Sequence, residues 1–129
     1  MQAAILVVED APDCRESLEI ALAGIGNFRV LSTASAEEAL IALAKNEIGA
    51  VVTDLNLPNM DGIALIEKIR LSPACVKLPI VVTSGDTTAA TRARLTQLKI
   101  DAFFAKPYSP GQVRRTLEQL IHAKKIDGD

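Results

Sequence analysis

The sequence has no hydrophobic run long enough to cross a membrane. A membrane-spanning helix needs about 20 consecutive apolar residues, and no stretch of the 129 residues approaches that length. The start of the chain also lacks the basic residues and the long apolar core of a signal peptide. These absences argue against an integral membrane protein and favour a cytoplasmic location, with no membrane partner.

Cysteine is also scarce. The two cysteines, Cys14 and Cys75, show neither the spacing of a zinc site nor the pattern of a disulfide-stabilised secreted domain. We expect both to be reduced thiols, with small and largely buried apolar side chains. This interpretation agrees with a cytoplasmic protein.

Neither sign of charge dominates the composition. Lysine and arginine number 14, aspartate and glutamate number 16, and the formal net charge is -2. A surface that holds nucleic acid by charge alone needs a strong positive balance, so we expect no direct binding of nucleic acid. Because 49% of the residues are hydrophobic and no repeat, linker or low-complexity segment occurs, residues 1–129 should form a single domain with a sizeable core.

Five short apolar runs alternate with five stretches of helical periodicity. We expect strands at residues 3–8, 28–31, 50–53, 78–84 and 102–105. We expect helices at residues 12–23, 35–45, 62–71, 86–98 and 109–124. This alternation predicts an α/β fold, a three-layer sandwich with a parallel sheet and helices on both faces. For five such units, the doubly wound, flavodoxin-like strand order 2-1-3-4-5 is expected.

Several helix starts carry capping residues. Ser35 and Glu38 match a capping box, in which each side chain bonds a free backbone N–H of the first turn. Ser109 and Pro110 combine a cap with a proline at the first helical position. Asp86 is the expected cap of the fourth helix.

One stretch, residues 50–62, combines a buried strand with turn chemistry. Its apolar start, residues 50–53, is typical of a strand that is buried on both faces. Asp54 comes next, and Pro58 soon follows in a segment that cannot continue a central strand. An isolated aspartate at this place is most often a loop residue that accepts backbone hydrogen bonds. A nucleophile or metal ligand needs partners from elsewhere in the chain.

The expected strand order supplies such partners at one edge of the sheet. Glu9 and Asp10 follow the first strand. The fourth strand ends in Ser84, and Lys106 follows the fifth. In a sheet of this order the ligand crevice lies at the carboxyl ends of the first and third strands. Three acids, including Asp54, therefore converge with one hydroxyl and one amine.

This group of side chains can support phosphoryl chemistry. Three neighbouring carboxylates need a compensating cation, and oxygen ligands on loops favour Mg²⁺. Asp54 can attack a phosphoryl group to give an acyl phosphate. Lys106 offers a positive charge, and Ser84 offers a hydrogen bond, to the phosphoryl oxygens.

Each residue has a simpler interpretation when it is taken by itself. Lys106 could be an ordinary exposed lysine, and Ser84 could close a turn before Gly85. Glu9 and Asp10 could cap the first helix. Their shared position at one edge of the predicted sheet favours a functional site over these separate roles.

Four short motifs together resemble the receiver domain of two-component response regulators, over essentially the whole chain. They are Val8-Glu9-Asp10, residues 54–62, residues 79–85 and Lys106-Pro107. The resemblance implies that Asp54 accepts a phosphoryl group from the phosphohistidine of a histidine kinase or phosphotransfer protein, or from a small phosphodonor. It also implies that Ser84 and Lys106 contact that group.

The resemblance further implies a metal site and a self-limiting signal. Glu9, Asp10 and Asp54 would bind Mg²⁺ together with the backbone carbonyl of Asn56. Family members hydrolyse their own acyl phosphate, and the residues at the positions of Asn56 and Asp86 help to set that rate. The expected function is therefore that of a phosphoacceptor signalling domain and not of an enzyme.

A conformational switch is implied as well. In this family the hydroxyl residue that ends the fourth strand is coupled to an aromatic residue on the fifth, which here is Phe103. When Ser84 moves toward the phosphate, Phe103 should rotate inward and change the face made by the fourth helix, fifth strand and fifth helix. That face would bind a downstream protein or a second copy of the chain. Phe103 could instead be plain core, and Phe104, on the opposite face of the strand, should be structural.

Three other functions are alternatives. A receiver-fold scaffold that works without phosphorylation would usually lack a part of the acidic site. A phosphatase of the haloacid dehalogenase type is suggested by Asp54-Leu55-Asn56, but there the motif follows the first strand and its second acid is aspartate. A flavodoxin-like FMN carrier would need a hydroxyl- and glycine-rich loop where Glu9 and Asp10 would repel phosphate.

The ends of the chain bear on what the domain is attached to. Met1 lies close to the first expected strand, as a natural amino terminus would, and nothing after Lys125 could form an output domain. We therefore expect either a stand-alone regulator that acts by binding partners or a receiver separated from its output domain.

Overall fold

The computed structural model describes the backbone of residues 2–128 and the side chains of residues 2–123. Strands and helices alternate along this part of the chain, as expected. The strands are β1 (Ala4–Val8), β2 (Arg29–Thr33), β3 (Ile48–Asp54), β4 (Ile80–Ser84) and β5 (Ala102–Ala105). The helices are α1 (Pro12–Leu22), α2 (Ala36–Lys45), α3 (Gly62–Leu71), α4 (Ala89–Gln97) and α5 (Pro110–Gly128), with a short 3₁₀ turn, η1 (Pro73–Cys75), before β4.

All five strands are parallel and lie in the order β2-β1-β3-β4-β5. This confirms the predicted doubly wound sheet. The strands also end nearly in register, since Val8 of β1 pairs with Thr53 of β3 and Ser84 of β4 pairs with Ala105 of β5. The residues that follow these strands are therefore brought to one edge of the sheet.

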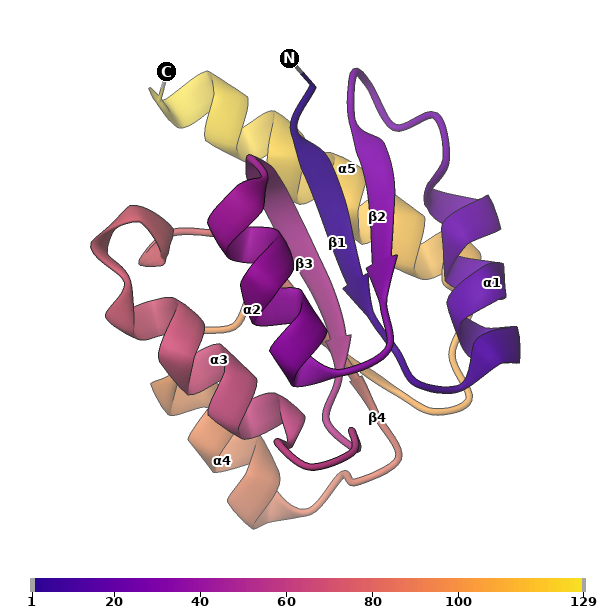
Figure 1. Ribbon diagram of the computed structural model, residues 1–129, viewed down its shortest axis with the longest axis vertical. Coiled ribbons are helices and arrows are strands. Elements are labelled where there is room, and N and C mark those ends of the chain that lie inside the picture. The colour runs from indigo at the N-terminus through magenta and orange to yellow at the C-terminus, as the bar shows by residue number, and fades with distance from the viewer. Residues whose placement is uncertain (1, 129) are drawn as a thin grey trace.

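Helices cover both faces of the sheet, with α1 and α5 on one side and α2, α3 and α4 on the other (Figure 1). The core on the first side includes Ile5, Val7, Leu18, Leu22, Val52, Val113 and Leu117. The core on the second side includes Leu6, Val8, Ala39, Val51, Leu65, Ile66, Ile80 and Leu95. Alternate residues of β1 thus point to opposite cores. No helix within residues 2–128 is long and apolar enough to cross a membrane.

Helix capping follows the sequence at two of three predicted positions. The Ser35 hydroxyl accepts a hydrogen bond from the Glu38 amide at 3.1 Å, and Ser109 caps α5. The prediction that Asp86 caps the fourth helix is wrong, because Thr88 is the cap. Asp86 instead accepts hydrogen bonds from the Thr88 amide and the Thr91 hydroxyl, and this turn delays the helix to Ala89.

The second strand lies slightly later than the apolar run predicted. It covers Arg29–Thr33, because pairing with β1 continues through two polar residues and the Thr33 hydroxyl donates to the Val7 carbonyl at 3.1 Å. Phe28 precedes the strand, and its ring occupies the space that a Cβ at Gly49 would need. Cys14 and Cys75 are free thiols, as expected, although both are only half-buried.

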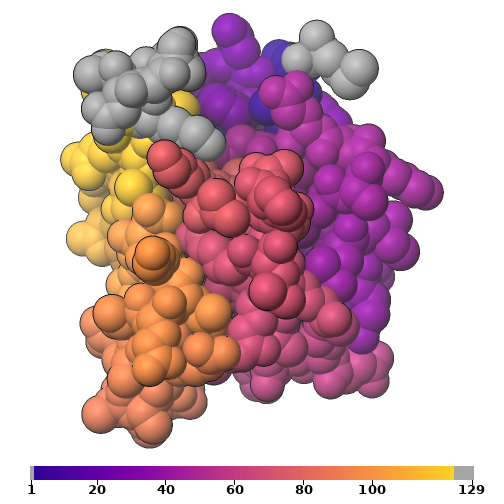
Figure 2. Space-filling model, turned by 90° about the vertical axis from the view of Figure 1, so that its left-hand side faces the viewer, coloured from indigo at the N-terminus to yellow at the C-terminus, as the bar shows by residue number. Residues whose placement is uncertain are grey.

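Helix α4 is held to the rest of the fold by few apolar contacts. Leu95 is its one buried residue, and Arg94 forms an ion pair with Glu67 of α3. Figure 2 shows this side of the molecule, where the orange surface around α4 lies beside the pink surface of α3. An element with little buried apolar surface costs little to displace.

Candidate functional site

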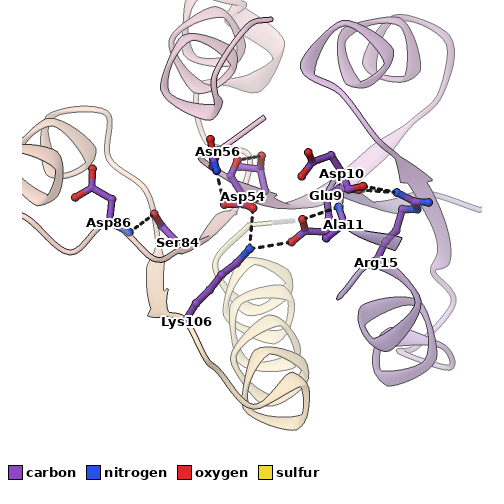
Figure 3. A network of polar contacts seen from close by, with 10 residues as sticks. Glu9, Asp10, Ala11, Arg15, Asp54, Asn56, Ser84, Asp86 and Lys106 are labelled. Atoms are coloured by element: carbon purple, nitrogen blue, oxygen red, sulfur yellow. Dashed lines mark hydrogen bonds and ion pairs between the residues drawn. The ribbon is translucent and has the colours of Figure 1, made fainter. Parts of the chain in front are cut away.

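The five residues predicted from the strand ends do meet at the carboxyl edge of the sheet (Figure 3). Glu9 and Asp10 follow β1, and Asp54 is the last residue of β3. Ser84 is the last residue of β4, and Lys106 follows β5. The parallel order with β1 and β3 as neighbours produces this meeting, because each loop leaves the sheet at the same edge.

A glycine lets helix α3 begin directly against Asp54. The Gly62 amide donates to the Leu55 carbonyl at 2.9 Å, and a Cβ at Gly62 would overlap the Asp54 carbonyl oxygen. The preceding residue, Asp61, caps α3 by accepting a hydrogen bond from the Ala64 amide. The loop after Asp54 is therefore fixed by the backbone of α3.

Three carboxylates form a compact cluster. Glu9, Asp10 and Asp54 each offer an oxygen atom, and these atoms all lie within 4.8 Å of one another. Glu9 is 1% exposed and Asp54 is 4% exposed, whereas Asp10 is exposed to solvent. Two of the three negative charges are thus held away from water, where mutual repulsion is strong.

The amine of Lys106 partly compensates this charge. Its Nζ lies 2.8 Å from Asp54 Oδ2 and 3.3 Å from Glu9 Oε1. Partial burial lowers the pKa of the Lys106 amine, but the hydrogen bonds and negative charges of Asp54 and Glu9 outweigh this effect and raise it above its usual 10.5. Lys106 is therefore charged at neutral pH.

The negative charge of Glu9 remains unfavourable in the folded protein. Burial raises the pKa of its carboxyl above the usual 4.5, and the charge of Asp54 raises it further. The Ala11 amide, which donates to Glu9 Oε2 at 3.1 Å, and the Lys106 amine lower the pKa without cancelling the increase. One ammonium group does not satisfy this cluster, and a further cation would stabilise it.

The donor set fits a hard divalent cation. Mg²⁺ prefers oxygen ligands and commonly takes one or two carboxylates. The Asp10 carboxylate accepts no hydrogen bond from any described residue, so both of its oxygens are free. The Asn56 amide donates to Asp54 Oδ1 at 3.1 Å, which places the Asn56 backbone beside the cluster.

Ser84 lies on the other side of Asp54 from Glu9 (Figure 3). It is 2% exposed, and its hydroxyl oxygen accepts a hydrogen bond from the Asp86 amide at 2.9 Å. Hydrogen bonds from the Thr88 amide and the Thr91 hydroxyl lower the pKa of the exposed Asp86 carboxyl. Asp86 therefore links the loop after β4 to the first turn of α4.

Phe103 and Phe104 point to opposite faces of β5, as predicted. Phe104 packs with the core beneath α1 and α5. Phe103 is half-buried against the core beneath α2, α3 and α4. The guanidinium of Arg92 in α4 lies over the Phe103 ring, 4.3 Å from its centroid, a geometry that gives a cation–π attraction.

The family comparison agrees with this geometry. The family model for the response regulator receiver domain matches residues 5–118. The chain belongs to the response regulator receiver domain family. Receiver domains are signalling domains and not classical enzymes, and the cluster of Glu9, Asp10 and Asp54 is of the kind found at receiver metal sites.

Individual relatives place the chain among CheY-like receivers. The chemotaxis protein CheY homolog of Campylobacter jejuni is 27% identical over 125 residues, which cover 96% of either chain. Response regulator Rre1 of Synechocystis is 29% identical over 97% of this chain, which spans about half (54%) of the length of Rre1. A crystal structure of a response regulator receiver protein from Pseudomonas putida is 31% identical, with a TM-score of 0.83 over 92% of this chain and 98% of that one.

Beside the receiver site lies a shallow cavity that the sequence did not reveal. Its volume is about 560 Å³, and its lining includes Cys14, Ser17, Lys106, Pro107 and Tyr108. Burial, reinforced by the charge of Glu9, raises the pKa of Tyr108 to about 12. The phenol is therefore neutral and lies within the electrostatic reach of the acidic cluster.

Arg15 was also missed by the sequence analysis. Its guanidinium donates to the backbone carbonyl of Glu9 at 2.9 Å. A helix that begins at Pro12 places Arg15 about one turn inside, and helical side chains point back toward the amino terminus. The position of Arg15 in the helix could be read from the sequence. That position alone does not distinguish an arginine that contacts the preceding loop from one that is solvated.

Proposed function

We propose that this receiver domain accepts a phosphoryl group on Asp54 from the phosphohistidine of a histidine kinase or phosphotransfer protein, or from a small phosphodonor. The observation that supports this most strongly is the Lys106 amine, which lies against Asp54 Oδ2 at 2.8 Å. It prepares positive charge where a phosphoryl group attached to Asp54 would carry negative charge.

The transfer is a substitution at phosphorus. An oxygen of Asp54 forms the new P–O bond, and the bond from phosphorus to the donor's imidazole nitrogen breaks. The electron pair of that bond leaves with the imidazole, whose nitrogen takes a proton from water, and no proton has to be removed from Asp54. An ionised carboxylate is already the nucleophile.

Mg²⁺ is the proposed cofactor. Glu9, Asp10, Asp54 and the backbone carbonyl of Asn56 would hold it. When bound, it supplies positive charge to the oxygens of the phosphoryl group. The compact cluster of three carboxylate oxygens supports this assignment.

Lys106 and Ser84 would bind the remaining phosphoryl oxygens. The Lys106 amine contacts Asp54 and Glu9 through separate oxygens and can keep one contact while it turns to the phosphate. The Ser84 oxygen already accepts the Asp86 amide, so its own proton is free to donate to the phosphate. Asn56 and Asp86 are exposed at the rim, where they can influence the water that hydrolyses the acyl phosphate.

The switch would run from Ser84 to the face formed by α4, β5 and α5. Movement of Ser84 toward the phosphate leaves space into which Phe103 rotates, and the contact between Phe103 and Arg92 is then lost. The altered face would recruit a downstream protein, an output domain or a second copy of the chain. The small buried surface of α4 makes such a rearrangement inexpensive.

Intact-mass analysis after incubation with Mg²⁺ and acetyl phosphate tests the proposal. We expect one phosphoryl adduct on the wild-type chain and none without Mg²⁺. Asp54→Asn should abolish the adduct, while Asp61→Asn, which changes an exposed helix-cap carboxylate, should retain it. If neither acetyl phosphate nor any histidine kinase gives an adduct, the proposal is contradicted. The phosphorylation-independent scaffold would then be the remaining function.

A further inference from the structure

Arg15 connects helix α1 to the segment that carries two of the three clustered acids. Its Nη1 donates to the Glu9 carbonyl at 2.9 Å and approaches the Asp10 carbonyl at 3.5 Å. Figure 3 shows the guanidinium on the side of this segment that faces away from Asp54. One side chain therefore contacts both peptide groups whose residues point their carboxylates into the cluster.

The two acids are anchored unequally. The Glu9 amide donates to the Thr33 carbonyl at 3.0 Å, and the Glu9 carboxylate accepts the Ala11 amide. Asp10 has no such support, since the contact with Arg15 is the one hydrogen bond it makes to the described part of the chain. The exposed Asp10 depends on Arg15 more than Glu9 does.

The location of Arg15 is not explained by helix preference. A positive charge near the amino end of a helix opposes the helix dipole. Within the described residues, the guanidinium forms no ion pair with Glu9, Asp10 or Asp54. Its contacts are to backbone carbonyls, which points to a role in holding the backbone.

We propose that Arg15 is a positioning residue for the metal site. By holding the carbonyls of Glu9 and Asp10 on the α1 side, it keeps the Asp10 carboxylate turned toward Asp54 before any cation binds. Without Arg15 this segment can rotate, so the metal must order the segment when it binds. That ordering lowers the affinity of the site for the metal. This inference rests on the proposed Mg²⁺ site.

The chain offers a matched control. Arg114 of α5 donates to the carbonyls of Ala21 and Ala23 at 2.8 and 2.7 Å, at the other end of α1. Arg15→Met and Arg114→Met each remove a guanidinium that binds two backbone carbonyls and keep an unbranched side chain. Of the two substituted positions, only Arg15 lies beside the acidic residues Glu9 and Asp10. Arg15→Lys keeps the charge and one possible hydrogen bond without the forked geometry.

The experiment is calorimetric titration of the unphosphorylated proteins with Mg²⁺, after circular dichroism has shown that each variant is folded. We expect Arg15→Met to raise the dissociation constant about tenfold. Arg114→Met should remain within about twofold of wild type, and Arg15→Lys should fall between. In acetyl phosphate assays, Arg15→Met should need more Mg²⁺ for half-maximal labelling but reach nearly the wild-type rate at saturation.

The outcomes separate this inference from the proposed function. If wild type binds Mg²⁺ and Arg15→Met binds it equally well, the positioning role is overturned and the site stands. Tighter binding by Arg15→Met would also overturn it, because the arginine would then act only as a repelling charge. If wild type bound no Mg²⁺, the proposed metal site and this inference would fall together.

Discussion

The Lys106 amine lies 2.8 Å from Asp54 Oδ2, which joins the end of β3 to the segment that follows β5. The same amine lies 3.3 Å from Glu9 Oε1. A single cation therefore bridges carboxylates from two neighbouring strands, and both of those carboxylates are buried. The charge of the acidic cluster is therefore balanced only in part.

Lys106→Met should slow labelling of Asp54 by acetyl phosphate by about 100-fold, because a preorganised charge at the transferring group is lost. The rate can be followed by intact mass at saturating Mg²⁺. Lys68→Met, which removes an exposed lysine on α3, is the control. Equal rates for the two variants would show that Lys106 serves no role in transfer.

Glu9→Gln should make the protein more stable than wild type at pH 7 without metal. Burial raises the pKa of Glu9 in the folded chain, so its favourable contribution exists below the unfolded value of about 4.5 and is lost as the pH rises through the folded pKa. Glutamine carries no charge at any pH, so the variant does not lose this stability as the pH rises.

Urea denaturation between pH 4 and pH 8 in the presence of a chelator measures this effect. The stability gap between Glu9→Gln and wild type should widen as the pH rises. With Mg²⁺ added it should shrink, because the variant has lost a proposed ligand. A gap that does not change with pH would contradict the assigned cause.

Gly62→Ala should lower the free energy of unfolding by about 2 to 3 kcal/mol, because the new Cβ would overlap the backbone of Asp54 and Leu55. Gly85→Ala is the matched control, since a Cβ there meets no atom within 4 Å, and it should change stability by less than about 0.5 kcal/mol. Urea denaturation of both variants tests this. Similar losses at the two positions would contradict the close approach at Gly62.

Arg92→Gln should release Phe103 from its observed orientation. A cation–π contact at an exposed site contributes about 0.5 to 1 kcal/mol, so its loss should change the ratio of ring orientations by about two- to fivefold. NMR of a labelled Phe103 ring in the unphosphorylated protein measures that ratio. Arg94→Gln, which breaks only the contacts with Glu67 and Gln97, should leave it unchanged.

Tyr108 should titrate with a pKa of about 12, because it is partly buried and lies near negative charge. It is the single tyrosine of the chain, so the phenolate absorbance near 295 nm reports one group. The ordinary rise around pH 10 should be absent while the protein is folded and should appear in denaturant. A folded-state midpoint near 10 would show that Tyr108 is open to solvent.

The strand order and the meeting of the acids were predictable because they depend on local patterns and on topology. Apolar runs located the strands, and the parallel order placed Glu9 and Asp10 beside Asp54. Individual side-chain contacts in the folded chain were not predictable in the same way. Thr88, and not Asp86, caps α4 because the two oxygens of the Asp86 carboxylate accept hydrogen bonds from the Thr88 amide and the Thr91 hydroxyl.

Other features depend on distant parts of the chain meeting in space. The cation–π contact of Arg92 requires α4 to lie over β5, and nothing in the local sequence around Arg92 specifies that. The cavity beside Tyr108 requires α1 to lie next to the segment before α5. Such contacts carry no periodic signal, so only the assembled structure reveals them.

The most direct test of the account is to identify the residue that becomes phosphorylated. The wild-type chain is incubated with Mg²⁺ and acetyl phosphate, treated with borohydride, which reduces an aspartyl phosphate to homoserine, and then digested for peptide sequencing by mass spectrometry. The account predicts homoserine at residue 54 and at no other acidic position. Homoserine at residue 9 or 10, or its absence from a chain that carries the phosphoryl adduct, would contradict Asp54 as the acceptor.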